Sequence, residues 1–290
     1  MSEKYVPSFV LNDGTEMPAI GFGTWKLRGD DALAAVRSAI DNGYRHIDTA
    51  AIYQNEVEVG KAIKDAITAG DVSREDLFIT SKVWNDQQAN HQVQEAFQAS
   101  LRNLGLDYLD CFMIHWPWPQ AGRYVERFAA LSTLQGLGVL QSVAVANFNG
   151  AQLQELRDKT DIVPAINQVE LHPGFSQPEL RAVHAELGVL TEAWSPLAQG
   201  DVGKSEVLIG IADKYGVTPA QVALRWIYQL GASSVPKSGT PTRQVENILI
   251  FDFELSEAEM TQITALDDAP GGGRLYADPD TFPGELTDQK

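Results

Sequence analysis

A short apolar run followed by a helical pattern recurs about eight times along this chain of 290 residues. Amphipathic stretches such as DALAAVRSAIDNG and QVQEAFQASLRNLG have apolar residues three or four apart and end in Gly, a common helix C-cap. Strand and helix alternating this often over about 250 residues predict an α/β fold, a parallel (β/α)8 barrel. The apolar runs lie at 44–48, 77–83, 108–114, 142–146, 165–169, 189–193 and 233–236, with a weaker one at 19–23.

The two ends of the chain do not follow this repeat of strand and helix. Near the start, FVLNDGTEMPAI holds an Asp-Gly turn between two β-prone runs, which predicts a hairpin closing the bottom of the barrel. No linker or shift in composition divides residues 1–290, so we predict a single domain with a short tail from about 270 to 290. Because this tail is brief and rich in Pro and Gly, we expect an open and permissive site.

Composition excludes several classes of partner. The net charge of −17 opposes binding to nucleic acid or to an anionic membrane, and no apolar stretch is long enough to span one. With a single cysteine, Cys111, and no export-type leader pattern, the chain is expected in the cytoplasm. The five histidines lack the spacing of a ligand set, so no metal is expected.

Polar and aromatic residues stand at the C-terminal end of nearly every predicted strand. Taken singly, each has an ordinary structural interpretation as a cap, a solvated charge or a core residue. Together they select one rim of the barrel, which is where such barrels place their chemistry. In chain order they are Thr24, Trp25, Asp48, Lys82, His115, Asn147, Gln168, Glu170, Trp194, Ser195, Lys237 and Ser238.

Asp48, Tyr53, Lys82 and His115 suggest one reaction if the rim brings them together. A tyrosine has a pKa of about 10 and is a poor acid, but a neighbouring ammonium lowers that pKa toward the working range. Asp48 can keep Lys82 charged, and His115 can direct a carbonyl oxygen. Tyr53 would then protonate the alkoxide as hydride arrives at carbon, so this set predicts carbonyl reduction.

The same residues lie in segments that resemble the aldo-keto reductase family. The likeness covers nearly the whole chain, in the family's order and approximate spacing, and it implies a catalytic tetrad at Asp48, Tyr53, Lys82 and His115. Within the family, VLNDG, Trp194 and the short tail look most like the bacterial 2,5-diketo-gluconate reductase group. The segments are GYRHIDTAAIYQNE (43–56), FITSKVW (78–84), IHWP (114–117), VANFN (145–149), NQVELHP (167–173), WSPLAQG (194–200) and VPKSGTPTRQVEN (235–247).

The resemblance implies an extended NADPH site on the rim, with NADH as a less favoured cofactor. GFGTWK does not complete a dinucleotide-binding loop. By similarity, Trp194 stacks on the nicotinamide and Asn147 and Gln168 bind its carboxamide. Lys237, Ser238, Thr240 and Arg243 hold the 2′-phosphate, which NADH lacks. Further cofactor contacts are implied for Gly23, Thr24, Trp25, Ser195, Leu197, Gln199, Glu246 and Asn247.

Other features bear on substrate and assembly. Trp25, Trp84 and Trp116 are expected to form an aromatic pocket for a small carbonyl substrate, and family likeness makes a monomer the expectation. Ala146 stands where the family usually has Ser, which removes a cofactor hydrogen bond worth about 0.5–1.5 kcal/mol. Weaker cofactor binding is therefore expected, with reductase activity retained.

Two alternatives from other classes stay open. One is a barrel enzyme that binds a phosphosugar and forms a Schiff base at Lys82 or Lys237. Asp48 beside Lys82 opposes it, because a charged lysine is not a nucleophile. The other is a non-catalytic NADPH-binding subunit, which the complete tetrad disfavours.

Overall fold

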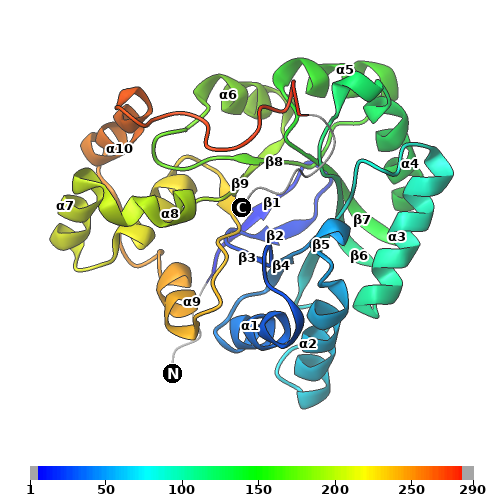
Figure 1. The fold of residues 1–290 in the computed structure, drawn as a ribbon, viewed down its shortest axis with the longest axis horizontal. Helices are drawn as coiled ribbons and strands as arrows, with labels where there is room; N and C mark the ends of the chain where they lie inside the picture. The colour runs from blue at the N-terminus through cyan, green and yellow to red at the C-terminus, as the bar shows by residue number, and fades with distance from the viewer. Residues whose placement is uncertain (1–5, 283–290) are drawn as a thin grey trace.

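Eight parallel strands form the central sheet of the computed structural model, which describes residues 6–282 (Figure 1). Ile20, just before the first of these strands, pairs with Ser234 in the last, so the sheet closes into the predicted barrel. Each predicted apolar run overlaps one strand. The strands are β3 (Phe22–Gly23), β4 (His46–Asp48), β5 (Phe78–Val83), β6 (Leu109–Ile114), β7 (Leu140–Ala146), β8 (Ile166–Glu170), β9 (Leu190–Trp194) and β10 (Ser233–Ser234).

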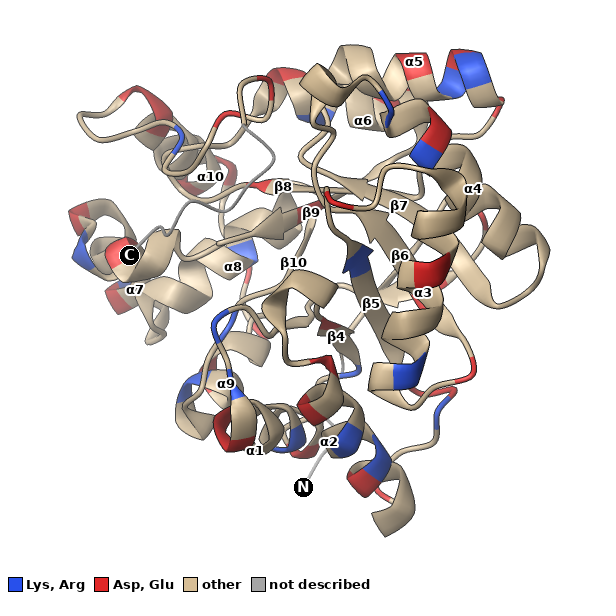
Figure 2. Ribbon diagram, turned by 45° about the vertical axis from the view of Figure 1, so that its right-hand side comes forward, with Lys and Arg blue, Asp and Glu red and all other residues tan. Residues whose placement is uncertain are grey.

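Helices surround the barrel and carry most of the charged side chains, whereas the strands are largely uncharged (Figure 2). Gly70 and Gly105 end two of the helices in the left-handed conformation, as predicted. The helices are α1 (Gly29–Asp41), α2 (Glu56–Ala69), α3 (Asn90–Leu104), α4 (Tyr124–Gly136), α5 (Gly150–Thr160), α6 (Pro178–Leu187), α7 (Glu206–Tyr215), α8 (Pro219–Gln229), α9 (Pro241–Ile248) and α10 (Glu257–Thr264), with short 3-10 helices η1 (Ala51–Tyr53), η2 (Pro119–Ala121), η3 (Ala198–Lys204) and η4 (Ala265–Asp268).

An antiparallel hairpin of β1 (Ser8–Val10) and β2 (Glu16–Pro18) covers the N-terminal ends of the strands. Leu11 and Met17 are buried in one cluster with Phe78, the first residue of β5. The Asn12 side chain donates to the backbone oxygen of Pro164, shortly before β8. The predicted hairpin is confirmed, and it leaves the opposite rim free for a site.

The barrel interior holds charged side chains near the C-terminal ends of the strands. Asp48, Lys82 and Glu192 are each at most 3% exposed. Burying a charge is costly unless it is paired, so such a cluster needs internal partners. Buried titratable groups with shifted pKa values are concentrated at functional sites.

Helices α2 and α3 approach each other closely at Gly60. A Cβ at this position would fall well inside van der Waals contact with the carbonyl oxygen of Leu104. We therefore expect Gly60→Ala to lower the free energy of unfolding by about 1–3 kcal/mol, measured by urea denaturation. Gly210→Ala on α7 is the matched control, because a Cβ there meets open space. It should raise the free energy of unfolding by about 0.5–1 kcal/mol, and equal effects of both variants would contradict this account.

Candidate active site

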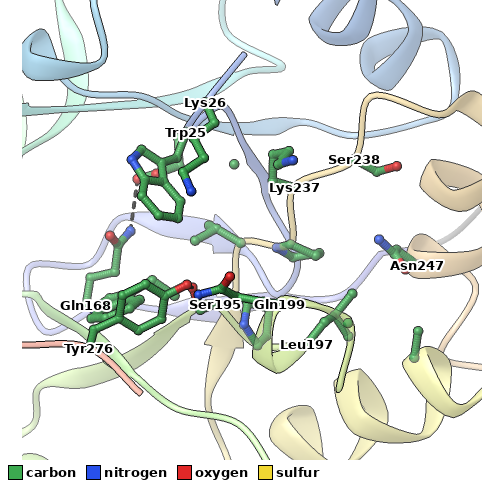
Figure 3. A pocket seen from close by; sticks show the side chains of 18 of the residues that line it. Trp25, Lys26, Gln168, Ser195, Leu197, Gln199, Lys237, Ser238, Asn247 and Tyr276 are labelled. Carbon is green, nitrogen blue, oxygen red and sulfur yellow. Dashed lines mark hydrogen bonds between the residues drawn. The ribbon is translucent and has the colours of Figure 1, made fainter. Parts of the chain in front are cut away.

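A cavity of ≈ 850 Å³ opens at the C-terminal ends of the strands. Tyr53 and His115 line it, and so do Lys237 and Arg243 from the segment after β10. In Figure 3, Trp25 and Lys26 lie on one side, with Ser195, Leu197, Gln199 and Tyr276 across from them. Residues far apart in the sequence thus meet at the rim that the strand register predicted.

Of the residues predicted for catalysis, cofactor binding or the substrate pocket, only Thr24 and Lys82 do not line this cavity. Thr24 is fully buried, and its hydroxyl donates to the backbone oxygen of Asp48 at 3.0 Å. Thr24 therefore supports the strand end and does not line the cavity, while its expected contact with a cofactor stays a prediction. Those that line the cavity are Gly23, Trp25, Asp48, Tyr53, Trp84, His115, Trp116, Asn147, Gln168, Trp194, Ser195, Leu197, Gln199, Lys237, Ser238, Thr240, Arg243, Glu246 and Asn247.

Lys82 lies beneath the cavity and joins Asp48 to Tyr53. Its ammonium donates to the Asp48 carboxylate at 2.6 Å and to the backbone oxygen of Thr49 at 3.0 Å. It also lies 5.4 Å from the centre of the Tyr53 ring, close enough for its charge to act on the Tyr53 hydroxyl. The His115 ring is 5.6 Å from the Tyr53 ring, nearly edge-on. The structure thus brings together all four residues of the expected tetrad.

Burial has the largest effect on the pKa values of Tyr53 and Lys82. Burial raises the pKa of Tyr53 to about 12, because the nearby Lys82 ammonium only partly offsets the lost hydration of a phenolate. The expected lowering of this pKa is therefore wrong for the cofactor-free protein. Burial lowers the pKa of Lys82, but Asp48, Tyr53 and Glu192 together outweigh this effect and raise that pKa. At neutral pH Tyr53 carries its proton and Lys82 carries its charge.

His115 is neutral in this site. Burial, together with the charges of Lys82 and Arg127, holds the pKa of His115 well below its usual range. A neutral imidazole can form a directed hydrogen bond to a carbonyl oxygen without adding charge. The Trp84 ring meets the His115 ring edge-on, with centres 5.0 Å apart, and so restricts its orientation.

Asn147 and Ser195 turn into the cavity from left-handed backbone conformations, with φ of 66° and 50°. Such conformations are unfavourable for residues other than glycine and are concentrated at functional sites. The Asn147 amide donates to the backbone oxygen of His115 at 3.0 Å and accepts from the Trp194 indole at 2.9 Å. One amide hydrogen and one lone pair of Asn147 are left for a ligand. The preceding Ala146 is fully buried and offers no donor.

The segment after β10 has the chemistry of an anion site. Lys237 and Arg243 are exposed, and neither forms an ion pair within residues 6–282. The Ser238 hydroxyl accepts from the backbone N–H of Thr240 at 3.1 Å, directly before α9. Two free cations beside a helix N-terminus suit a phosphate group.

The C-terminal tail covers part of the cavity, which sequence reasoning missed. Tyr276 meets the Trp194 ring at 4.9 Å, and Phe282 stacks on Trp116 at 4.3 Å. The expectation that the tail leaves the site open is therefore wrong for residues 270–282, which include side chains that line the cavity. Residues 283–290 lie outside the described residues. Two aromatic residues in a tail rich in Pro and Gly were the available signal, because exposed aromatic side chains tend to pack.

Glu170 fixes the path of this tail. Its buried carboxylate accepts from the backbone N–H groups of Leu275 at 2.6 Å and Tyr276 at 3.3 Å. His172 lies 3.2 Å from the same carboxylate. Glu170 stands on the predicted rim, but it holds protein backbone and does not line the main cavity.

Further lining residues were not predicted individually. They come from loops, from η1 and η3 and from the start of α8, where no strand end marks them. Within the described part of the chain, no group of three or more His, Cys, Asp or Glu could hold a metal ion, and no helix is long and apolar enough to cross a membrane. The additional lining residues include Lys26, Ile52, Pro196, Gly200, Val202, Gly203, Thr218, Pro219 and Ala220.

Comparison with known proteins was made on both sequence and structure. The model of the Aldo/keto reductase family matches residues 19–268. An aldo-keto reductase of Mycolicibacterium smegmatis is 47% identical over 276 residues, covering 95% of this chain and 98% of the relative. Methylglyoxal reductase DkgA of Salmonella typhimurium is 46% identical, covering 94% of this chain and 97% of the relative.

Solved structures show the same likeness. An aldo/keto reductase from Brucella melitensis is 43% identical with a TM-score of 0.86, covering 91% of this chain and all of that one. A Bombyx mori aldo-keto reductase in complex with NADP is 37% identical with a TM-score of 0.85, covering 90% of this chain and 92% of that one.

Proposed function

This chain belongs to the aldo/keto reductase family of oxidoreductases, and within it we propose that Tyr53 gives the proton in an NADPH-dependent reduction of small aldehydes and ketones. The observation that carries this proposal is the contact of Lys82 with both Asp48 and Tyr53 at the floor of the cavity. A buried ammonium is suited to stabilise the phenolate that remains after Tyr53 has given up its proton.

The residues present fit the cofactor. When bound, NADPH supplies the hydride that reduces the carbonyl carbon. Trp194 offers an aromatic face for the nicotinamide, and Asn147 and Gln168 offer amide groups for its carboxamide. Lys237 and Arg243 are free to hold a phosphate. The NADP complex of the Bombyx mori relative supports this assignment.

The side chains then divide the remaining work. Neutral His115 directs the substrate carbonyl oxygen toward Tyr53, whose hydroxyl donates the proton. Lys82 stabilises the resulting phenolate, and Asp48 keeps Lys82 charged and in place. General acid catalysis of this kind contributes about a hundredfold to about ten-thousandfold in rate.

The pocket wall suggests the substrate class. Trp84, Trp116 and Phe282 form an apolar wall close to the His115 end of the cavity. We propose small carbonyl compounds, including α-dicarbonyls such as methylglyoxal and keto-sugars such as 2,5-diketo-gluconate, as substrates. The methylglyoxal reductase DkgA relatives support the first of these. Rates of NADPH oxidation with a panel of aldehydes, α-dicarbonyls and keto-sugars test the choice.

A Schiff-base mechanism at Lys82 is disfavoured. The amine is fully buried, charged and bonded to Asp48, so it has no free lone pair for attack on a carbonyl. Borohydride should therefore trap no lysine adduct in the presence of a carbonyl substrate. The assembled tetrad likewise disfavours a role limited to cofactor binding.

Cofactor preference gives a direct test at Arg243. Losing a charge-assisted hydrogen bond costs about 1.5–3 kcal/mol, so Arg243→Ala should raise the KM for NADPH about tenfold to about a hundredfold. The KM for NADH should change little, because NADH has no 2′-phosphate. Arg102→Ala on the outer face of α3 is the control and should leave both values unchanged. Equal losses with NADPH and NADH would contradict the assignment.

We also propose a single-domain monomer located in the cytoplasm. The closed sheet runs from residue 22 to residue 234, which supports one domain. The single cysteine, Cys111, is buried and free, as suits a reducing compartment. Sedimentation equilibrium measures the oligomeric state, and a stable dimer would contradict this part of the proposal.

A further inference from the structure

Glu192 is a buried carboxylate with no part in the reaction described above. It lies in the middle of β9, faces the barrel interior and is fully buried. It accepts from the Gln168 amide nitrogen at 2.6 Å and from the Ser233 hydroxyl at 3.2 Å. Glu192 does not line the cavity, so it can reach a ligand only through Gln168.

The Gln168 amide is held between two carboxylates. Its nitrogen donates to Glu192 and also to Asp48, at 2.9 Å, and the second bond is drawn in Figure 3. An amide nitrogen has two hydrogens, and both are used. The carbonyl oxygen of Gln168 makes no hydrogen bond within the described residues, and Gln168 lines the cavity. This orientation leaves that oxygen free to accept from the N–H of a carboxamide.

Four titratable groups face Glu192 from strands β4, β5 and β6, across the barrel interior. Burial lowers the pKa of His46 to about 3 and raises that of Cys111 well above its usual range, so both are neutral. Asp48 and Lys82 form an ion pair of opposite charges. Burial, and then the Asp48 carboxylate, raise the pKa of Glu192 to about 7. Glu192 therefore changes charge near neutrality, while His46 and Cys111 stay neutral and Lys82 stays charged.

We propose that Glu192 is a positioning residue that, when ionised, fixes the Gln168 amide and so makes nicotinamide binding depend on pH. This inference rests on the proposed NADPH site. Protonation removes one of the two anions that attract the amide nitrogen, and a carboxyl O–H competes for the amide oxygen instead. Affinity for the nicotinamide half is fully developed above the pKa of Glu192 and falls as the pH drops through it.

The test compares two ligands by quenching of tryptophan fluorescence. NADP+ carries the carboxamide, whereas 2′-phospho-ADP-ribose carries the same 2′-phosphate and diphosphate without nicotinamide. The ratio of their Kd values cancels the titration of the shared 2′-phosphate. One hydrogen bond corresponds to about twofold to about tenfold in affinity, so NADP+ should weaken by that factor relative to 2′-phospho-ADP-ribose between about pH 8.5 and about pH 5.5.

Glu192→Gln is the informative variant, because it keeps an oxygen acceptor but has no proton to gain. Its ratio of Kd values should stay flat with pH, while exposed Glu186→Gln on α6 should behave like the wild type. A flat wild-type ratio, or an unchanged slope in Glu192→Gln, would overturn the proposal. Failure of both ligands to bind would instead overturn the NADPH site itself.

A second measurement does not depend on the variant folding. Infrared difference spectra of the free wild-type protein, with 13C-labelled glutamate, should show a carboxylic acid band that titrates near neutrality. Exposed glutamates titrate at about pH 4.3 and are distinguished by that midpoint. Absence of a glutamate titrating above about pH 6 would also overturn the proposal.

Discussion

Replacing Tyr53 by Phe is expected to reduce kcat by about a hundredfold to about ten-thousandfold while leaving NADPH binding within about twofold of the wild type. The ring stays and still packs near His115, with centres 5.6 Å apart in the parent protein, so only the proton donor is removed. The measurement is the rate of NADPH oxidation with methylglyoxal, alongside a Kd from fluorescence quenching. Retained turnover would exclude Tyr53 as the acid.

Tyr44→Phe is the matched control for this substitution. Tyr44 is also buried, but its hydroxyl donates to the backbone oxygen of Gln244, away from the cavity. This variant should lose about 0.5–1.5 kcal/mol of stability and keep its turnover. A similar loss of kcat in both variants would point to general damage and not to proton transfer.

Replacing Lys82 by Met should cost about 3–5 kcal/mol in the free energy of unfolding at neutral pH. The Asp48 carboxylate would remain buried without the ammonium that lies 2.6 Å away in the parent protein. Met is close to Lys in shape, so the loss reports the missing charge more than a cavity. Urea denaturation measures it, and activity should be lost as well, because no cation stabilises the phenolate.

The double variant Lys82→Met with Asp48→Asn separates stability from catalysis. Removing both charges eliminates the unpaired carboxylate, so most of the lost stability should return. Turnover should not return, since the ammonium beside Tyr53 is still absent. Additive losses of stability in the double variant would show that the two side chains do not act as a pair.

The barrel and most of the site could be predicted from the sequence for one physical reason. In a closed parallel sheet the C-terminal ends of all strands share one rim, so residues such as Lys82 and Asn147 are brought together by register alone. The apolar runs located the strands to within three residues, and the polar residues at the end of each run located the site. Thr24 does not line the cavity, because its side chain turns inward to the backbone of Asp48.

What the sequence did not predict depends on tertiary contacts. No local pattern indicates that Phe282 stacks on Trp116, because this contact depends on the path of the tail. The pKa of Tyr53 was expected to fall, but the expectation counted the charge of Lys82 and not the cost of burial. Glu192 was not predicted either. The alternation of inward and outward side chains along β9 does not indicate which residues of other strands face Glu192.

The anchor of the tail has a consequence for how a protein like this can change. Glu170 bonds main-chain N–H groups at Leu275 and Tyr276, and such bonds are indifferent to the side chains they hold. Side chains in the tail can therefore be substituted without breaking the hydrogen bonds that hold the tail at the rim. The catalytic residues of the barrel can in this way stay unchanged while the tail that covers the cavity varies. Each tail sequence would then admit its own set of carbonyl compounds.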